Sequence, residues 1–90
     1  MNMKKILVLG GGGFIGGHLA KELKSKGSHV RIADRKKHEY FPHHEICDEF
    51  IQCDLRNQSA VEIVISEDID EIYQLAADMG GCWIYFYRPK

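Results

Sequence analysis

A run of glycines near the N-terminus is the first feature of this sequence that could do chemistry. The segment Gly10–Gly16 (GGGGFIG) follows a short apolar run, Ile6–Leu9, and precedes a stretch with helical periodicity. Between a strand and a helix, such a turn lets the backbone approach a pyrophosphate, and the helix N-terminus offers it unpaired N–H groups. Gly10 would allow the tight turn, Gly13 the close approach of the phosphates, and Gly16 the packing of the helix on the sheet.

An acidic residue after the next apolar stretch adds a second chemical feature. The alternating segment His29–Ala33 ends at Asp34, where a carboxylate can accept hydrogen bonds from both hydroxyls of an adenosine ribose. A Walker-type phosphate loop is excluded, because the chain continues Gly16–His18 without a Gly-Lys-Ser/Thr sequence. The pattern predicts NAD as the cofactor. NADP is expected to bind less well, because Asp34 would repel its 2′-phosphate and the adjacent Arg35 would offset only part of that repulsion.

The elements that must position these residues alternate along the chain. Strands are predicted at 6–9, 29–33, 50–53 and 70–75, helices at 14–26 and about 57–65, and a loop with room for one helical turn at 35–45. The apolar stripe predicted for the first helix is Phe14, Ile15, Leu19, Ala20 and Leu23. Gly27 is suited to end that helix. Asn57 or Ser59 could cap the later helix.

This alternation predicts an α/β domain that forms a partial Rossmann fold. About four strands would make a parallel sheet in the order 3-2-1-4, with helices on both faces. The apolar members of the later helix are Val61, Ile63, Val64 and Ile65. The all-apolar run Ile6–Leu9 is typical of a strand buried on both faces.

Length and composition limit the possible classes of protein. The 90 residues are 44% hydrophobic and 28% charged, with a formal charge of −1, which fits one small domain and favours neither a nucleic acid nor a membrane partner. The N-terminal apolar run is too short for a signal peptide, and no stretch approaches a membrane span of about 20 residues. Cys47, Cys53 and Cys82 show no disulfide framework. We therefore expect reduced thiols and a cytoplasmic location.

Several segments carry a family resemblance. Val8–Leu19 (VLGGGGFIGGHL) resembles the opening of the extended short-chain dehydrogenase/reductase group of NAD-dependent sugar-nucleotide epimerases and dehydratases, which typically have T-G-x-x-G-F-I-G-S-H-L here. Asp34–Tyr40 (DRKKHEY), Cys47–Phe50 (CDEF) and above all Leu75–Gly81 (LAADMGG) resemble one member of that family in particular. The resemblance covers about residue 4 to residue 81, which is most of the chain.

The resemblance implies a set of cofactor-binding residues. Those on the phosphate side are Gly10, Gly13 and Gly16, together with the backbone of Phe14 and Ile15. Those on the remaining parts of the cofactor are Asp34 at the ribose, Asp54 and Leu55 at the adenine, and Leu75, Ala76 and Ala77 at the nicotinamide side. Two positions depart from the family: Leu9 replaces its usual Thr, and Gly17 replaces a Ser or Ala. Both departures would loosen the glycine turn without abolishing binding.

The residues that perform the family's reaction are not found in this sequence. That reaction needs a Tyr-x-x-x-Lys pair, and none of the four tyrosines has a lysine four positions later. We divide the chain into 1–81, the N-terminal part of an NAD-binding domain, and 82–90, an aromatic tail that does not match the family. The sequence predicts a truncated or frameshifted epimerase or dehydratase portion without catalytic residues, whose nucleotide-sugar substrate binds only in full-length relatives. A stand-alone, non-catalytic NAD(H)-binding or redox-sensing module is the alternative.

Two further segments lead to expectations about partners. The aromatic tail contains Trp83–Tyr87, an uncharged run of strong strand formers. Next to an unpaired sheet edge, it predicts a homo-oligomer. The loop Arg35–Glu45 and the residues just after it contain His38, His43, His44 and Cys47. Because no zinc-protease motif is completed there, we expect a solvated loop and no metal site.

Overall fold

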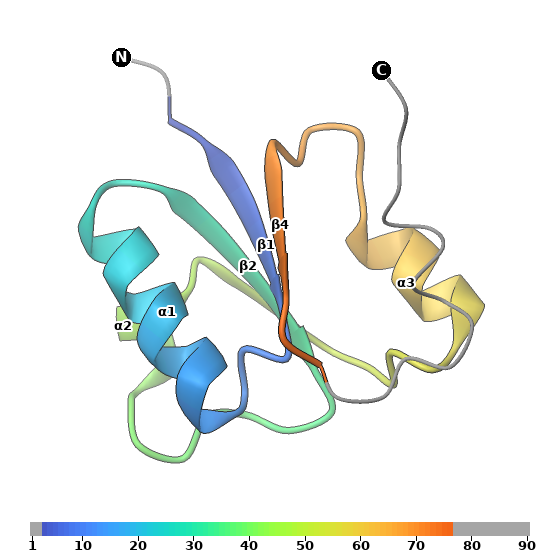
Figure 1. Cartoon of the computed structure of the whole chain (residues 1–90), viewed down its shortest axis with the longest axis horizontal. Coiled ribbons are helices and arrows are strands. Elements are labelled where there is room, and N and C mark those ends of the chain that lie inside the picture. Colours follow the sequence, from blue (N-terminus) through green and yellow to red (C-terminus); the bar gives the residue numbers. More distant parts are fainter. Residues whose placement is uncertain (1–2, 77–90) are drawn as a thin grey trace.

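The computed structural model describes residues 3–76 of the chain. Its elements in chain order are β1 (Lys5–Leu9), α1 (Phe14–Ser25), β2 (His29–Asp34), α2 (His43–Ile46), β3 (Glu49–Gln52), α3 (Gln58–Val64) and β4 (Glu71–Gln74). The strands form one parallel sheet in the order β3-β2-β1-β4 (Figure 1). The predicted α/β architecture and strand order are confirmed. Among residues 3–76, no helix has the length and apolar character needed to cross a bilayer.

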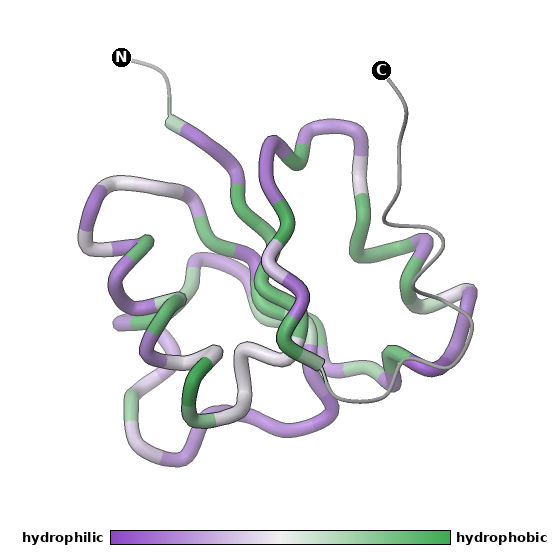
Figure 2. The backbone as a smooth tube through the Cα atoms, viewed as in Figure 1, coloured by the Kyte–Doolittle hydropathy of each residue, from purple (hydrophilic) through white to green (hydrophobic). Residues whose placement is uncertain are grey.

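The central strand β1 builds the two layers of the core. Ile6 and Val8 point to one face of the sheet and Leu7 and Leu9 to the other, and all four are at most 2% exposed. Helices α1 and α2 cover the first face and α3 covers the second (Figure 1). Figure 2 shows hydrophobic residues concentrated along the central strands. The prediction of a strand buried on both faces, with helices on each side, is confirmed.

The buried residues of helix α1 are small, namely Gly16, Gly17 and Ala20. Ala20 packs in the cluster with Ile6 and Val8 of the sheet, while Gly16 faces the glycine turn and Gly17 faces His38. The predicted stripe was wrong for Phe14 and Ile15, which are 65% and 70% exposed. Side chains on a helix tilt toward its N-terminus, so those of the first turn project past the end of the sheet.

The helix ends follow the sequence signals. Gly27, at φ 95°, takes the left-handed conformation, and its N–H donates to the carbonyl of Lys24 at 3.0 Å. Of the two candidate caps for α3, Asn57 is the one used, because its side chain accepts from the Ala60 N–H. Of the apolar members of this helix and its C-cap, Val61, Val64 and Ile65 are buried, and Ile63 is 69% exposed.

Strand β4 forms one edge of the sheet. It pairs with β1 from Ile6↔Glu71 to Leu9↔Gln74, and within residues 3–76 no further strand pairs with its outer side. The aromatic tail lies outside the described residues, so the predicted domain division and homo-oligomer stay predictions.

An ionic cluster at the opposite end of the sheet from the glycine turn joins β2, β3 and α3. Arg31 Nε donates to Glu49 Oε2 at 3.0 Å, and Arg31 Nη1 donates to the Val64 carbonyl and the Ser66 hydroxyl, both at 2.9 Å. His29 Nε2 lies 3.1 Å from the same Glu49 oxygen. The Arg31 side chain is only 11% exposed, so the Glu49 carboxylate provides the opposite charge for a guanidinium group that is nearly buried.

Asp48, the other carboxylate of the CDEF segment, also holds elements together. Its Oδ2 accepts from the Val30 N–H at 2.8 Å, and its Oδ1 lies 3.3 Å from Lys24 Nζ of α1. These hydrogen bonds hold the pKa of Asp48 below its usual value, although partial burial opposes them. The CDEF segment therefore has a structural role, at the end of the sheet away from the glycine turn.

The substitution Glu49→Gln should lower the free energy of unfolding at pH 7. It should also make that free energy fall less steeply as the solution is acidified. The hydrogen bond from Arg31 holds the pKa of Glu49 below its usual value in the folded chain. The contribution of the Glu49 carboxylate to the free energy of unfolding is therefore fully present above its pKa in the unfolded chain, about 4.3. This contribution is lost as the pH falls through its lower pKa in the folded chain. Urea unfolding at several pH values between about 3 and 7 measures both effects. The control is Glu39→Gln, a 67% exposed carboxylate; a parallel pH curve for Glu49→Gln and the parent would contradict the assignment.

Candidate functional site

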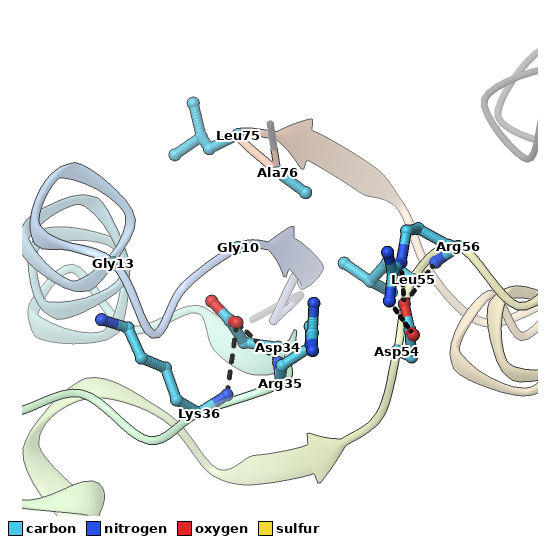
Figure 3. A pocket seen from close by; sticks show the side chains of 10 residues that line it. All are labelled: Gly10, Gly13, Asp34, Arg35, Lys36, Asp54, Leu55, Arg56, Leu75 and Ala76. Carbon is cyan, nitrogen blue, oxygen red and sulfur yellow. Dashed lines mark hydrogen bonds and ion pairs between the residues drawn. The ribbon is translucent and has the colours of Figure 1, made fainter. Parts of the chain in front are cut away.

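A pocket of about 340 Å³ lies at the carboxyl ends of the strands (Figure 3). Its lining consists of Gly10, Gly13, Asp34, Arg35, Lys36, Asp54, Leu55, Arg56, Leu75 and Ala76. The end of each strand, or the segment just after it, contributes to this lining, because in a parallel sheet all the carboxyl ends meet at one edge. Open α/β sheets bind their ligands at this edge, where the strand order reverses. Here that point lies between β1 and β4.

Gly10 makes the turn out of β1. It has φ 88°, and its N–H donates to the Ala33 carbonyl at 2.9 Å. A β-carbon at Gly10 would lie 2.8 Å from the backbone nitrogen of Ala76, so both conformation and packing require glycine. At Gly16 a β-carbon would overlap the Gly10 carbonyl oxygen. The absence of a side chain at Gly16 therefore lets the helix pack on the turn, and not on the sheet as the sequence suggested.

Gly13 differs from its neighbours, because no contact with residues 3–76 requires it to be glycine. Its backbone is extended, with φ −83° and ψ 173°, which any residue adopts. Among the described residues, a β-carbon there would meet only the Gly10 carbonyl oxygen, at an ordinary 3.5 Å. Gly13 also lines the pocket, so the space above it is open to a ligand.

The N-terminus of α1 begins at this point. Its N-cap, Gly13, makes no side-chain cap, and the first turn of this fully described helix contains no acidic residue. The first N–H groups of a helix have no acceptor within the helix and carry partial positive charge. The backbone of Phe14 and Ile15 can therefore serve an anion, which is the role predicted for it, while their side chains are exposed and do not line the pocket.

Asp34 ties the end of β2 to the glycine turn. Its Oδ2 accepts from the Gly12 N–H at 2.8 Å, and its Oδ1 accepts from the Arg35 N–H at 2.6 Å. The Arg35 carbonyl in turn accepts from Gln52 Nε2 of β3 at 2.9 Å. The carboxylate is held on the pocket wall (Figure 3). Oδ1 also accepts from the Lys36 N–H at 3.4 Å, whereas Oδ2 has one partner and keeps a lone pair for a ligand hydroxyl.

Asp54 is held in place by a nearby arginine. Arg56 Nε donates to Asp54 Oδ1 at 3.1 Å and Arg56 Nη2 to Asp54 Oδ2 at 2.9 Å (Figure 3). These hydrogen bonds hold the pKa of Asp54 well below its usual range. The carboxylate is therefore an ionised acceptor on the far wall of the pocket, beside the 4% exposed Leu55.

The structure brings most of the predicted residues together. Seven of them line the pocket, namely Gly10, Gly13, Asp34, Asp54, Leu55, Leu75 and Ala76. Gly16 lies beneath the turn, and Ala77 lies outside the described residues. Their binding roles stay predictions.

Sequence reasoning missed two cations in the pocket lining, Lys36 and Arg56, and expected Arg35 only to weaken the preference for NAD. The available signal was their position, one or two residues after Asp34 and Asp54.

The histidines of the loop do not form a metal site in the described part of the chain. No three His, Cys, Asp or Glu side chains among residues 3–76 come together in a way that could hold an ion. His43 and His44 are exposed. The expected solvated loop was wrong for His38, which packs face to face on Phe41 with ring centroids 5.0 Å apart.

Comparisons of sequence give the family. The model of the NAD dependent epimerase/dehydratase family matches residues 6–90. GDP-mannose 3,5-epimerase of Arabidopsis thaliana is 43% identical over 77 residues, 86% of this chain and 20% of the relative. This is the member whose likeness the segments Asp34–Tyr40, Cys47–Phe50 and Leu75–Gly81 predicted. UDP-glucuronic acid decarboxylase 1 of Danio rerio is 36% identical over 92 aligned positions, covering 96% of this chain and 20% of that protein.

Solved structures agree with the sequence comparison. An epimerase from Methanothermobacter thermautotrophicus superposes with a TM-score of 0.72 at 31% identity, over 86% of this chain and 24% of that one. UDP-glucose 4-epimerase of Thermus thermophilus, in complex with NAD, superposes with a TM-score of 0.66 at 28% identity, over 82% of this chain and 24% of that one. The chain thus spans about a fifth of the length of the relatives matched by sequence. On its sequence, its sheet order and these matches, the chain belongs to the NAD dependent epimerase/dehydratase family.

Proposed function

We propose that this chain binds NAD through the adenosine diphosphate half of the cofactor, as the N-terminal portion of a nucleotide-sugar epimerase or dehydratase. The observation that carries the proposal is the open space over Gly13, at an uncapped helix N-terminus inside the pocket. A glycine that neither backbone nor packing explains is accounted for by a pyrophosphate that needs its place. The NAD complex of a structural neighbour supports the choice of cofactor.

Each wall of the pocket has a role in this proposal. The N–H groups at the start of α1 bind the pyrophosphate, and Asp34 accepts hydrogen bonds from the adenosine ribose. Asp54, held ionised by Arg56, accepts from the adenine amino group. Leu75 and Ala76 extend the wall toward the nicotinamide side. These residues bind and orient the cofactor.

The chemical step belongs to groups other than these. Bound NAD supplies reversible hydride transfer with a nucleotide sugar. No tyrosine of this chain is followed four positions later by lysine, and proton transfer by such a positioned group is worth about 10²–10⁴-fold. We therefore propose that these 90 residues bind the cofactor but do not epimerise a sugar by themselves, and that the sugar-binding residues belong to the part of the relatives that this chain does not span.

The chain should bind NAD about tenfold more tightly than NADP, a difference of about 1.4 kcal/mol. The Asp34 carboxylate that accepts the ribose hydroxyls would repel a 2′-phosphate at the same place. Arg35 and Lys36 also line the pocket and offset part of this repulsion, so a preference is expected and not exclusion. Isothermal titration calorimetry with each dinucleotide measures the ratio of the two Kd values.

The matched variant for this measurement is Asp34→Asn. It keeps the size of the side chain and an acceptor oxygen but removes the charge, so the NADP-to-NAD ratio of Kd values should fall toward one. Equal or tighter binding of NADP by the parent chain would overturn the role of Asp34. Absence of NAD binding at millimolar concentrations would overturn the proposed function itself.

A further inference from the structure

We propose that His38 and Gly17 form a positioning pair that fixes the loop after β2 against α1 and thereby sets the discrimination between NAD and NADP. This inference rests on the proposed function. His38 does not line the pocket, but Arg35 and Lys36, just before it in the same loop, do. The pair acts on the cofactor only through the placement of those two cations.

Gly17 provides a socket for the His38 ring. It lies in the interior of α1 and is buried, where glycine is about 1 kcal/mol less favourable than alanine. A β-carbon there would overlap Cδ2 and Nε2 of His38 and would lie 2.8 Å from its Cγ. The ring therefore occupies the volume that any other residue at this position would fill. This contact gives a physical reason for the departure from the Ser or Ala that is usual in the family.

Hydrogen bonds and stacking keep the ring in that socket. Nδ1 of His38 accepts from the Tyr40 N–H at 3.0 Å and from the Phe41 N–H at 3.2 Å. The ring stacks on Phe41 at an interplanar angle of 16°, and Lys21 Nζ lies 4.2 Å from the centroid of the Phe41 ring. The imidazole thus closes its own loop and attaches it to the helix.

The other ring nitrogen, Nε2, does not help to hold the ring in place. Because Nδ1 accepts two N–H groups, the proton of the neutral imidazole lies on Nε2. Nε2 is buried and has no hydrogen-bond partner among the described residues. A buried donor left without a partner is unfavourable, so the ring stays there because packing and the two bonds to Nδ1 outweigh that cost.

The same loop is attached to the glycine turn at a second point. The Lys36 carbonyl passes so close to Gly12 that a β-carbon there would overlap its oxygen, and the Gly12 N–H donates to Asp34 Oδ2 at 2.8 Å. The loop is therefore held at Gly12 through Asp34 and the Lys36 backbone, and at Gly17 through His38. Without the His38 attachment, the backbone of Arg35 and Lys36 would be held only by Asp34, Gln52 and Gly12, which leaves the two cationic side chains more room to approach a 2′-phosphate.

The first test compares dinucleotide affinities in the full chain. We expect His38→Ala and His38→Phe to lower the ratio of the NADP Kd to the NAD Kd by about threefold or more. His38→Phe keeps an aromatic ring but has no acceptor for the two N–H groups. His38→Asn restores an acceptor and should bring the ratio back toward the parent value. A purely structural role would weaken both dinucleotides by the same factor, and an unchanged ratio would overturn the inference.

The second test does not depend on any ligand. Gly17→Ala should lower Tm by about 4 °C or more in the parent, because it expels the ring. In the His38→Ala background the same change should raise Tm by a similar amount, since the socket is empty and alanine is the better helix former. An effect of the same sign in both backgrounds would overturn the socket.

The two proposals fail in different ways. If the parent chain binds NAD and the His38 variants keep the parent's ratio of NADP Kd to NAD Kd, the positioning role alone is overturned. A parent chain that binds neither dinucleotide overturns the proposed function and the discrimination with it, while the reversal of sign still tests the contact between Gly17 and His38.

Discussion

Gly13→Val is expected to weaken NAD binding at least about tenfold, or 1.4 kcal/mol, while the fold is retained. The extended backbone of Gly13 accepts valine without strain, and in the described part of the chain the new β-carbon would touch only the Gly10 carbonyl oxygen, at 3.5 Å. The branched side chain would instead fill the open space over the helix N-terminus, where the pyrophosphate must approach. Calorimetry measures the affinity, and circular dichroism and thermal unfolding check the fold.

Two graded variants sharpen this experiment. Gly13→Ala adds only the β-carbon and should cost less affinity than valine does. Gly13→Ser adds a hydroxyl that can cap the helix N–H groups and compete with the phosphates, so it should weaken NAD binding while stabilising the helix. If the valine variant binds NAD like the parent, the pyrophosphate lies elsewhere and the proposed site is wrong.

Gly10→Ala should destabilise the chain by about 2–4 kcal/mol, a large share of the roughly 5–10 kcal/mol expected for a small domain. At φ 88° a side chain costs about 1–2 kcal/mol. The added β-carbon would also lie 2.8 Å from Ala76 N and 3.0 Å from the Leu75 carbonyl carbon. Those backbone atoms cannot retreat freely, because the Leu75 N–H donates to the Leu9 carbonyl at 2.8 Å. Urea unfolding measures the loss.

The matched control is Gly27→Ala. Gly27 has a similar φ of 95°, but no atom of residues 3–76 lies within 4 Å of where its β-carbon would be. Its substitution should therefore cost only the left-handed conformation, about 1–2 kcal/mol. The difference between the two variants is the cost of separating the glycine turn from the end of β4. If the two variants lose the same free energy of unfolding, the close approach of Gly10 to Leu75 and Ala76 adds nothing to the cost of the Gly10→Ala substitution.

The sheet was predictable because its signals are local. The apolar run Ile6–Leu9 marks a doubly buried strand whatever its partners are, and the glycine turn and Asp34 place the ends of β1 and β2 at one edge. The positions of Gly27 and Asn57 likewise depend only on neighbouring residues. Most of the pocket lining follows from these elements.

What could not be predicted depends on where elements end in space. Helical periodicity assigns Phe14 and Ile15 to an apolar stripe, but it cannot show that the sheet stops beneath the first turn. Similarly, nothing near His38 in the sequence shows that its ring would occupy the space above Gly17. Such contacts join segments that meet only after the sheet has formed.

The pairing of β1 with β4 also bears on how the chain is made. Ile6 pairs with Glu71 and Leu9 with Gln74, so β1 is synthesised before β2, β3 and β4 but can complete its pairing only after β4 has been made. Until then, one flank of the most apolar strand is open, and the pocket lacks the wall formed by Leu75 and Ala76. Such long-range closure is slow compared with helix formation. The nascent chain therefore exposes an aggregation-prone edge until β4 has emerged, and a dinucleotide can find the wall formed by Leu75 and Ala76 only after residue 76 has emerged.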